Sequence, residues 1–172
     1  MPRLHLVYSA DNDYSDLTSP IVVGVVFILF LSAVIAYFLK KQTIITRLFE
    51  MVAGEEAWNL ALVGCLFTGV IFWMIASTDV SSFIRSREVY NSDQMLFVEG
   101  RVTDYSPMPP AGHADEYFTV KDVGFNFSDY EEGIGGYHNA ASHGGVIRPN
   151  LYVKIGYYHT DFRNIILKLE TE

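Results

Sequence analysis

The chain has 172 residues, of which 50% are hydrophobic and 19% are charged, and its formal net charge is −8. This composition excludes a disordered chain, a coiled coil, a collagen and a disulfide scaffold, since Cys65 is the only cysteine. The part after residue 80 carries eight Lys or Arg against thirteen Asp or Glu. We therefore expect no nucleic-acid partner, because phosphate contacts need clustered cations.

The first nineteen residues predict an acidic N-terminal tail, 1–19, and the run 20–39 that follows contains no charged residue. At about 1.5 Å per residue, the nineteen residues 21–39 span about 28 Å, close to the hydrocarbon thickness of a bilayer. The run predicts a first transmembrane helix, with Lys40 and Lys41 at the membrane interface. A signal peptide would begin with a basic segment, whereas this chain begins with an acidic one.

The segment 40–56 predicts a loop that contains an amphipathic helix. Five apolar residues recur at helical spacing along one face: Ile44, Ile45, Leu48, Phe49 and Val52. Such a face is typical of a helix that lies in the membrane interface. An extension of the first helix beyond the bilayer is the alternative.

A second uncharged run, 57–78, predicts a second transmembrane helix, and Trp58 and Trp73 near its ends suit interfacial anchors. Gly64, Thr68 and Gly69 are small residues at spacings that let two helices approach closely. This small-residue face would pack either on the first helix or on a second copy of the chain.

The distribution of positive charge gives an orientation for the two spans. The connection between the spans carries Lys40, Lys41 and Arg47, which favours a cytoplasmic position for that connection. Both termini would then lie outside. We expect a multi-pass protein of the inner membrane whose C-terminal domain is extracytoplasmic.

Residues 79–93 form a polar connector, or alternatively continue the second helix. Beyond them the hydrophobic period changes from helical to alternating, so that 94–172 predicts a β domain. Five strands are expected, near 96–103, 117–121, 123–127, 151–157 and 165–169. Five short strands must protect their edges, and closure into a small OB-like β-barrel does so. The predicted fold class is therefore an α+β membrane protein with two transmembrane helices and a five-stranded barrel. An SH3-like barrel or an open sandwich is the alternative.

Several short strings in 97–170 resemble a group of small bacterial membrane-anchored proteins of uncharacterised function. The strings are Val98-Glu99-Gly100-Arg101-Val102, Pro107-Met108-Pro109, Gly112-His113, Phe125-x-Phe127-Ser128-Asp129-Tyr130 and Ser142-His143-Gly144-Gly145-x-Ile147. The resemblance implies a membrane-anchored protein and brings no activity with it.

The Gly-rich loop 133–148 is the first candidate site for a ligand. The backbone N–H groups of Ser142, His143, Gly144 and Gly145 could face an anion, and Arg148 could add a charge-assisted bond. Asn139 and His113 complete the predicted ligand-binding set. In the alternative interpretation the glycines only satisfy backbone geometry, and His143 and Asn139 form hydrogen bonds within the loop.

Enzymatic chemistry finds less support in the sequence. His113, His138, His143 and Asp129 could supply zinc ligands, but only His138 and His143 are close in sequence, so no metal or cofactor is predicted. Ser142 and His143 are adjacent and lack the strand–turn–helix elbow of a serine nucleophile. No catalytic residue is predicted.

These observations favour a membrane-tethered binding module, for example an accessory subunit of an envelope complex. It would contact a protein or small ligand through 133–148 and the proline-rich connection 107–113. Its partners would be the lipid bilayer and a membrane protein or a second copy. The alternative is a sensor–effector whose cytoplasmic barrel binds a nucleotide-like anion and controls oligomerisation of the spans.

Overall fold

The computed structural model describes residues 3–109, 114–130 and 135–172, and the chain divides into two units. The helical unit comprises residues 17–80, and the sheet unit comprises the residues up to 16 together with 81–172. The helical unit is therefore an insertion between the first strand and the second strand of the sheet unit.

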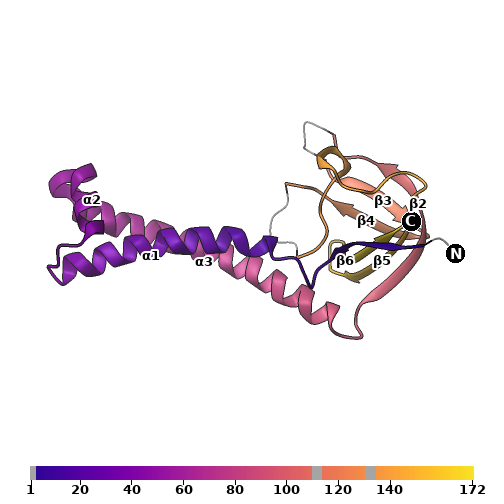
Figure 1. Ribbon diagram of the computed structural model, residues 1–172, viewed down its shortest axis with the longest axis horizontal. Coiled ribbons are helices and arrows are strands. Elements are labelled where there is room, and N and C mark those ends of the chain that lie inside the picture. Colours follow the sequence, from indigo (N-terminus) through magenta and orange to yellow (C-terminus); the bar gives the residue numbers. More distant parts are fainter. Residues whose placement is uncertain (1–2, 110–113, 131–134) are drawn as a thin grey trace. The chain divides into compact units, whose positions relative to one another are not determined.

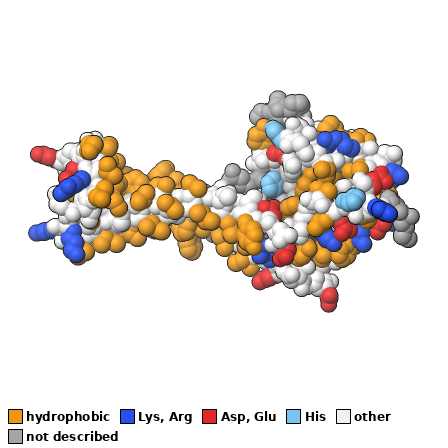
Figure 2. Space-filling model, viewed as in Figure 1, with side chains coloured by type: hydrophobic (Ala, Val, Ile, Leu, Met, Phe, Trp, Pro, Cys, Tyr) orange, Lys and Arg blue, Asp and Glu red, His pale blue; other side chains and the backbone are white. Residues whose placement is uncertain are grey.

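The helical unit contains α1 (Thr18–Phe38), α2 (Ile44–Ala53) and the greater part of α3 (Ala57–Tyr90). Figure 1 shows α1 and α3 side by side, and Figure 2 shows hydrophobic side chains along their length. Both helices are long and apolar enough to span a membrane. Large apolar side chains are exposed along both helices, among them Ile21, Val22, Ile28, Val63, Leu66, Phe67 and Trp73.

Small residues of α3 pack against aromatic rings of α1. Gly64 lies directly against the ring of Phe30, and a Cβ atom at Gly69 would lie 3.0 Å from Phe27. The hydroxyl of Thr68 donates to the carbonyl oxygen of Gly64 at 2.7 Å, so it is satisfied within α3. The small-residue face was expected to pack either on the first helix or on a second copy of the chain. In the structure Gly64 and Gly69 pack on α1 of the same chain.

A separate helix, α2, forms where the amphipathic segment was expected, and the first helix does not continue through it. Thr43 begins α2 with a capping box, in which its side chain accepts from the amide of Thr46. The predicted apolar face divides in two. Phe49 packs edge-on against Phe30 of α1, whereas the other side of α2 exposes Ile44, Leu48, Met51 and Val52.

The second long helix does not end where the apolar run ends. α3 continues as a helix to Tyr90, so the expected connector 79–93 is mostly helical. Residues 81–90 belong to the sheet unit, where Val89 and Tyr90 contribute to a small core with Tyr158, Ile165 and Leu167.

The sheet unit is a six-stranded antiparallel sheet in the order β1-β6-β5-β2-β3-β4. Its strands are β1 (His5–Ser9), β2 (Leu96–Ser106), β3 (Glu116–Val120), β4 (Val123–Phe127), β5 (Tyr152–His159) and β6 (Asn164–Thr171). The fold class is α+β, as predicted, but the expectation of a closed five-stranded barrel is wrong. The N-terminal residues, expected to form only a tail, supply β1. Because β1 pairs along β6, it occupies the edge that closure onto β4 would have needed.

The sheet bends along β2, which pairs with β5 through Leu96–Arg101 and then with β3 from Val102 onward. This bend brings the aromatic face of the β3–β4 hairpin over β5 and β6. Phe125 stacks on Phe118 at 5.2 Å and meets Tyr157 edge-on at 5.3 Å. The side-chain amide of Asn164 donates to the carbonyl oxygen of Gly124, which links the start of β6 to β4.

The packing of Gly64 on Phe30 gives a first testable prediction. Gly64→Leu should lower the free energy of unfolding of the purified protein in detergent by about 1–3 kcal/mol, because the ring must leave its place. Thermal unfolding measures the change. Val63→Leu, one position earlier and exposed, is the matched control and should leave the melting temperature unchanged. Equal melting temperatures for the two variants would contradict the packing.

Candidate functional site

The loop between β4 and β5 contains a short turn of helix, Ala141–His143, that two carboxylates hold in place. Asp129 accepts a hydrogen bond from the amide of Ala140, and Glu116 accepts one from the amide of Ala141 at 2.9 Å. Asp129 comes just after β4 and Glu116 begins β3. The loop is therefore fastened to the hairpin beneath it by two charged anchors.

The amide groups of the expected anion site are used inside the loop. The amides of His143 and Gly145 donate to the carbonyl oxygen of Ala140 at 3.0 and 2.8 Å, and the amide of Gly144 donates to Ala141 at 3.4 Å. Arg148 also folds back, and its Nη1 atom donates to the carbonyl oxygens of Gly145 and Ile147. The amides of the central turn and the Arg148 guanidinium therefore have acceptors within the loop.

Both glycines are required by the path of the backbone. Gly144 has φ +96°, a left-handed conformation that side chains disfavour. At Gly145 a Cβ atom would lie 2.7 Å from the carbonyl carbon of Ala140. The glycines therefore allow the chain to turn back on itself at this point.

His143 forms a hydrogen bond with the Asp129 carboxylate through its Nδ1 atom, and the Ser142 hydroxyl lies 3.3 Å from the same nitrogen. A catalytic serine and the carboxylate that orients its histidine need opposite ring nitrogens. This arrangement therefore provides no proton relay. The half-exposed His143 ring meets the exposed Tyr130 ring edge-on at 6.1 Å.

Glu116 is fully buried, a role that the sequence did not indicate. Its Oε2 atom accepts from Ala141, and the Tyr105 hydroxyl lies 3.4 Å away, while Oε1 has no hydrogen-bond partner among the described residues. Burial raises the pKa of this carboxyl, and hydrogen bonds from backbone amides oppose the rise only in part. The alternating pattern of 116–120 could have shown that Glu116 points inward with Phe118 and Val120.

A groove of about 320 Å³ lies beside the loop, between it and β1. It is lined by Val7, Tyr8, Asp13, Ser15, Tyr137, His138, Asn139 and Val146. Burial alone would raise the pKa of the Asp13 carboxyl. Hydrogen bonds from the hydroxyl and the amide of Ser15 outweigh burial and lower it. Of the predicted ligand-binding residues, Asn139 lines this groove.

The other predicted residues are distributed more widely. Ser142, His143 and Gly144 are exposed at the loop, whereas His113 lies outside the described residues. His138 bonds to the carbonyl oxygen of Gly136 through Nδ1 and does not join His143. Within the described part of the chain no three His, Cys, Asp or Glu side chains form a metal-binding group.

The residues expected at a membrane interface belong to the helical unit. Trp58 packs edge-on against Tyr37 with ring centroids 6.0 Å apart, while Trp73 is largely exposed. Lys40 and Lys41 follow the end of α1 and are exposed.

Comparison of the chain with protein-family models, curated proteins and solved structures finds no match. The resemblance to membrane-anchored bacterial proteins therefore stays a prediction.

Buried Glu116 predicts a pH dependence. Because its pKa is raised in the folded protein, the folded state binds the proton more tightly than the unfolded chain does. Its burial therefore costs stability increasingly as the pH rises above the ordinary value of 4.5. Glu116→Gln should match the wild type near pH 4 and exceed it in stability at pH 7. Urea unfolding at both pH values measures this, with exposed Glu172→Gln as the control, and a constant difference would contradict it.

Proposed function

We propose that the chain is a membrane-anchored interaction module in which the sheet unit presents loop 135–148 to a protein partner. The anchor would be the helical hairpin of α1 and α3. Their length, their apolar composition and the large apolar side chains exposed along them support this role. Apolar side chains that would be unfavourable in water have no such cost when they contact lipid tails.

The pairing of β1 with β6 supports an anchor that crosses the membrane twice. β1 precedes α1, whereas β6 follows α3, and both strands belong to one sheet. Two crossings return the chain to its starting side, so that the strands can pair. Lys40, Lys41 and Arg47 between the crossings favour a cytoplasmic turn, which puts the sheet unit on the extracytoplasmic face of the inner membrane.

The observation that carries the binding role is the preformed state of loop 135–148. Asp129 and Glu116 fasten it, and its own carbonyl groups occupy the amides of its central turn. A loop that is ordered before binding loses little conformational entropy when a partner docks. The loop exposes Ser142, His143 and Val146, and the exposed Tyr130 ring lies beside His143, so the surface mixes aromatic, polar and small apolar groups that suit a protein interface.

A protein partner fits this surface better than a nucleotide-like anion does. An anion would need free amide donors, and the amides of His143, Gly144 and Gly145 already have acceptors. It would also approach the carboxylates of Asp129 and Glu116, which repel negative charge. The sensor–effector alternative thus receives no supporting contact from the loop.

The orientation gives a testable prediction. In a Cys65→Ala background, Ser142→Cys should react with a membrane-impermeant thiol reagent in intact cells, because Ser142 is exposed on the sheet unit. Gln42→Cys, between α1 and α2, is the matched control and should react only after lysis. The reverse pattern would place the sheet unit in the cytoplasm.

The interaction role has its own test. A photo-crosslinking amino acid at Ser142 should give one discrete heavier product in cells, and the same amino acid at exposed Asp122 should not. Asp129→Asn should reduce the yield from Ser142 about tenfold, because it weakens the charged anchor that holds the loop. Equal yields at Ser142 and Asp122 would contradict the proposal.

A further inference from the structure

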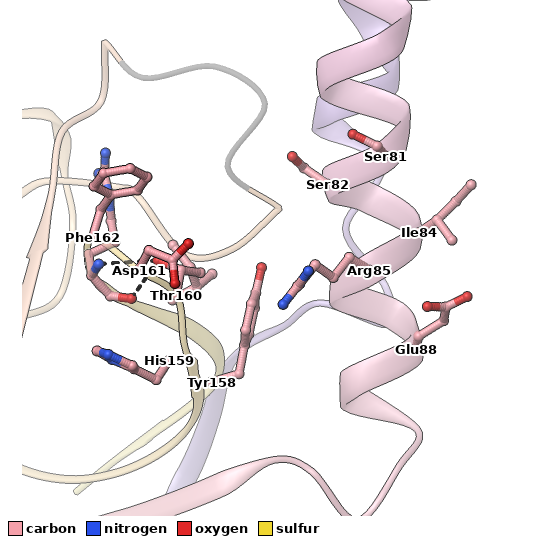
Figure 3. Close-up of a pocket in the computed structure, with 12 residues that line it drawn as sticks. Ser81, Ser82, Ile84, Arg85, Glu88, Tyr158, His159, Thr160, Asp161 and Phe162 are labelled. Carbon is pink, nitrogen blue, oxygen red and sulfur yellow. Dashed lines mark hydrogen bonds between the residues drawn. The ribbon is translucent and has the colours of Figure 1, made fainter.

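A second and larger groove lies in the sheet unit, between the last turns of α3 and the turn that joins β5 to β6. Its volume is about 790 Å³. The helix contributes Ser81, Ser82, Ile84, Arg85 and Glu88, and the strands and turn contribute 158–163 and Ile165. Figure 3 shows Arg85 and Tyr158 pointing into the space between these two walls.

Arg85 supplies an available cation in this groove. Its side chain is exposed, and its guanidinium carbon lies 5.8 Å from the centre of the Tyr158 ring. Tyr158 is 7% exposed and belongs to the small core beneath, so its ring is a fixed platform. The ring contact orients the guanidinium plane. Among the described residues Arg85 forms no ion pair, so its N–H groups are available to an acceptor.

The β5–β6 turn, which forms the facing wall of the groove, presents the carboxylate of Asp161 and the apolar ring of Phe162. Thr160 and Arg163 close the β5–β6 turn through reciprocal hydrogen bonds of 2.8 to 3.1 Å. The closed turn holds Asp161 and Phe162 out from the strands, and Figure 3 shows the Asp161 carboxylate on the side of Arg85. Phe162 is 91% exposed, which is unfavourable for a phenyl ring in water.

The helix α3 carries both the apolar run 57–78 and the residues that form one wall of the groove. Arg85 follows Thr78, the last residue of that run, by two turns of one uninterrupted helix. At 1.5 Å per residue, this is about 10 Å along the axis. The head-group layer on each side of a bilayer is about 5–8 Å thick. With the apolar run in the membrane as proposed, a long arginine side chain at this position would reach lipid phosphates.

We propose that this groove binds the zwitterionic head group of a membrane phospholipid of the phosphoethanolamine class, an inference that rests on the proposed membrane anchoring. Arg85 donates to the phosphate, Asp161 accepts from the ammonium group, and Phe162 lies against the apolar part of the lipid. Opposite charges on facing walls match a ligand with two opposite charges. A free phosphate would be repelled by Asp161, although Arg163 and His159 also line the groove.

Native mass spectrometry of the full chain, released from detergent with added phosphatidylethanolamine, tests the proposal. The wild type should retain the lipid, and Arg85→Gln should raise the apparent Kd about tenfold. Arg101→Gln is the matched control, since that guanidinium also lies 5.8 Å from a tyrosine ring, that of Tyr152, but outside the groove. Equal losses in the two variants would overturn the site.

The exposed turn allows a second variant that leaves the core untouched. Asp161→Lys should reverse the preference from phosphatidylethanolamine to the anionic phosphatidylglycerol, while Asp122→Lys on another turn should not. An unchanged preference, or competition by inorganic phosphate as strong as by phosphoethanolamine, would overturn zwitterion recognition.

The two proposals fail in different ways. Release of the chain from membranes by alkaline carbonate would refute the anchoring. Retention in membranes together with loss of head-group preference would refute the groove alone.

Discussion

The pairing of β1 with β6 is the contact on which the arrangement of the chain depends. It joins the residues before α1 to the last strand after α3, so that one sheet receives both ends of the helical unit. It also occupies the edge of β6, which makes closure of the sheet unnecessary. Under the proposed membrane anchoring, two crossings would return the chain to the side of the membrane on which β1 lies.

Much of this fold could be predicted from the sequence where the pattern is long. The runs 20–39 and 57–78 gave two apolar helices, and alternation gave the five strands after residue 94. β1 was missed because it is short and precedes a group of aspartates that dominates the composition of the tail. The prediction of a closed barrel was wrong for the same reason. Closure was expected to protect the free edge of the last strand, but β1 already pairs with that edge. Pairing between two strands so far apart in the sequence, such as β1 and β6, leaves no pattern in the local sequence.

The candidate loop shows the limit of motif reasoning more clearly. The sequence singles out Gly144 and Gly145, but their spacing could not show whether the amides face a ligand or the chain itself. In the structure the amides of Gly144 and Gly145 donate to the carbonyl oxygens of Ala141 and Ala140, so they face the chain itself. Asp129 and Glu116 take the preceding amides of Ala140 and Ala141. Buried charge is costly unless it is hydrogen-bonded. The loop thus uses the amides of Ala140 and Ala141 to satisfy the carboxylates of Asp129 and Glu116.

The position of β1 in the sheet also determines when the sheet can be completed during translation. Of the six strands, β1 leaves the ribosome first and its partner β6 leaves last, after the whole helical unit and the other four strands. Loop closure over such a distance is slow, and a strand without its partner exposes unpaired N–H and C=O groups. The helices can form within local sequence long before the sheet is complete. A chain that stops before residue 164 therefore leaves β1 without its partner, so completion of the last strand is the step that closes the fold.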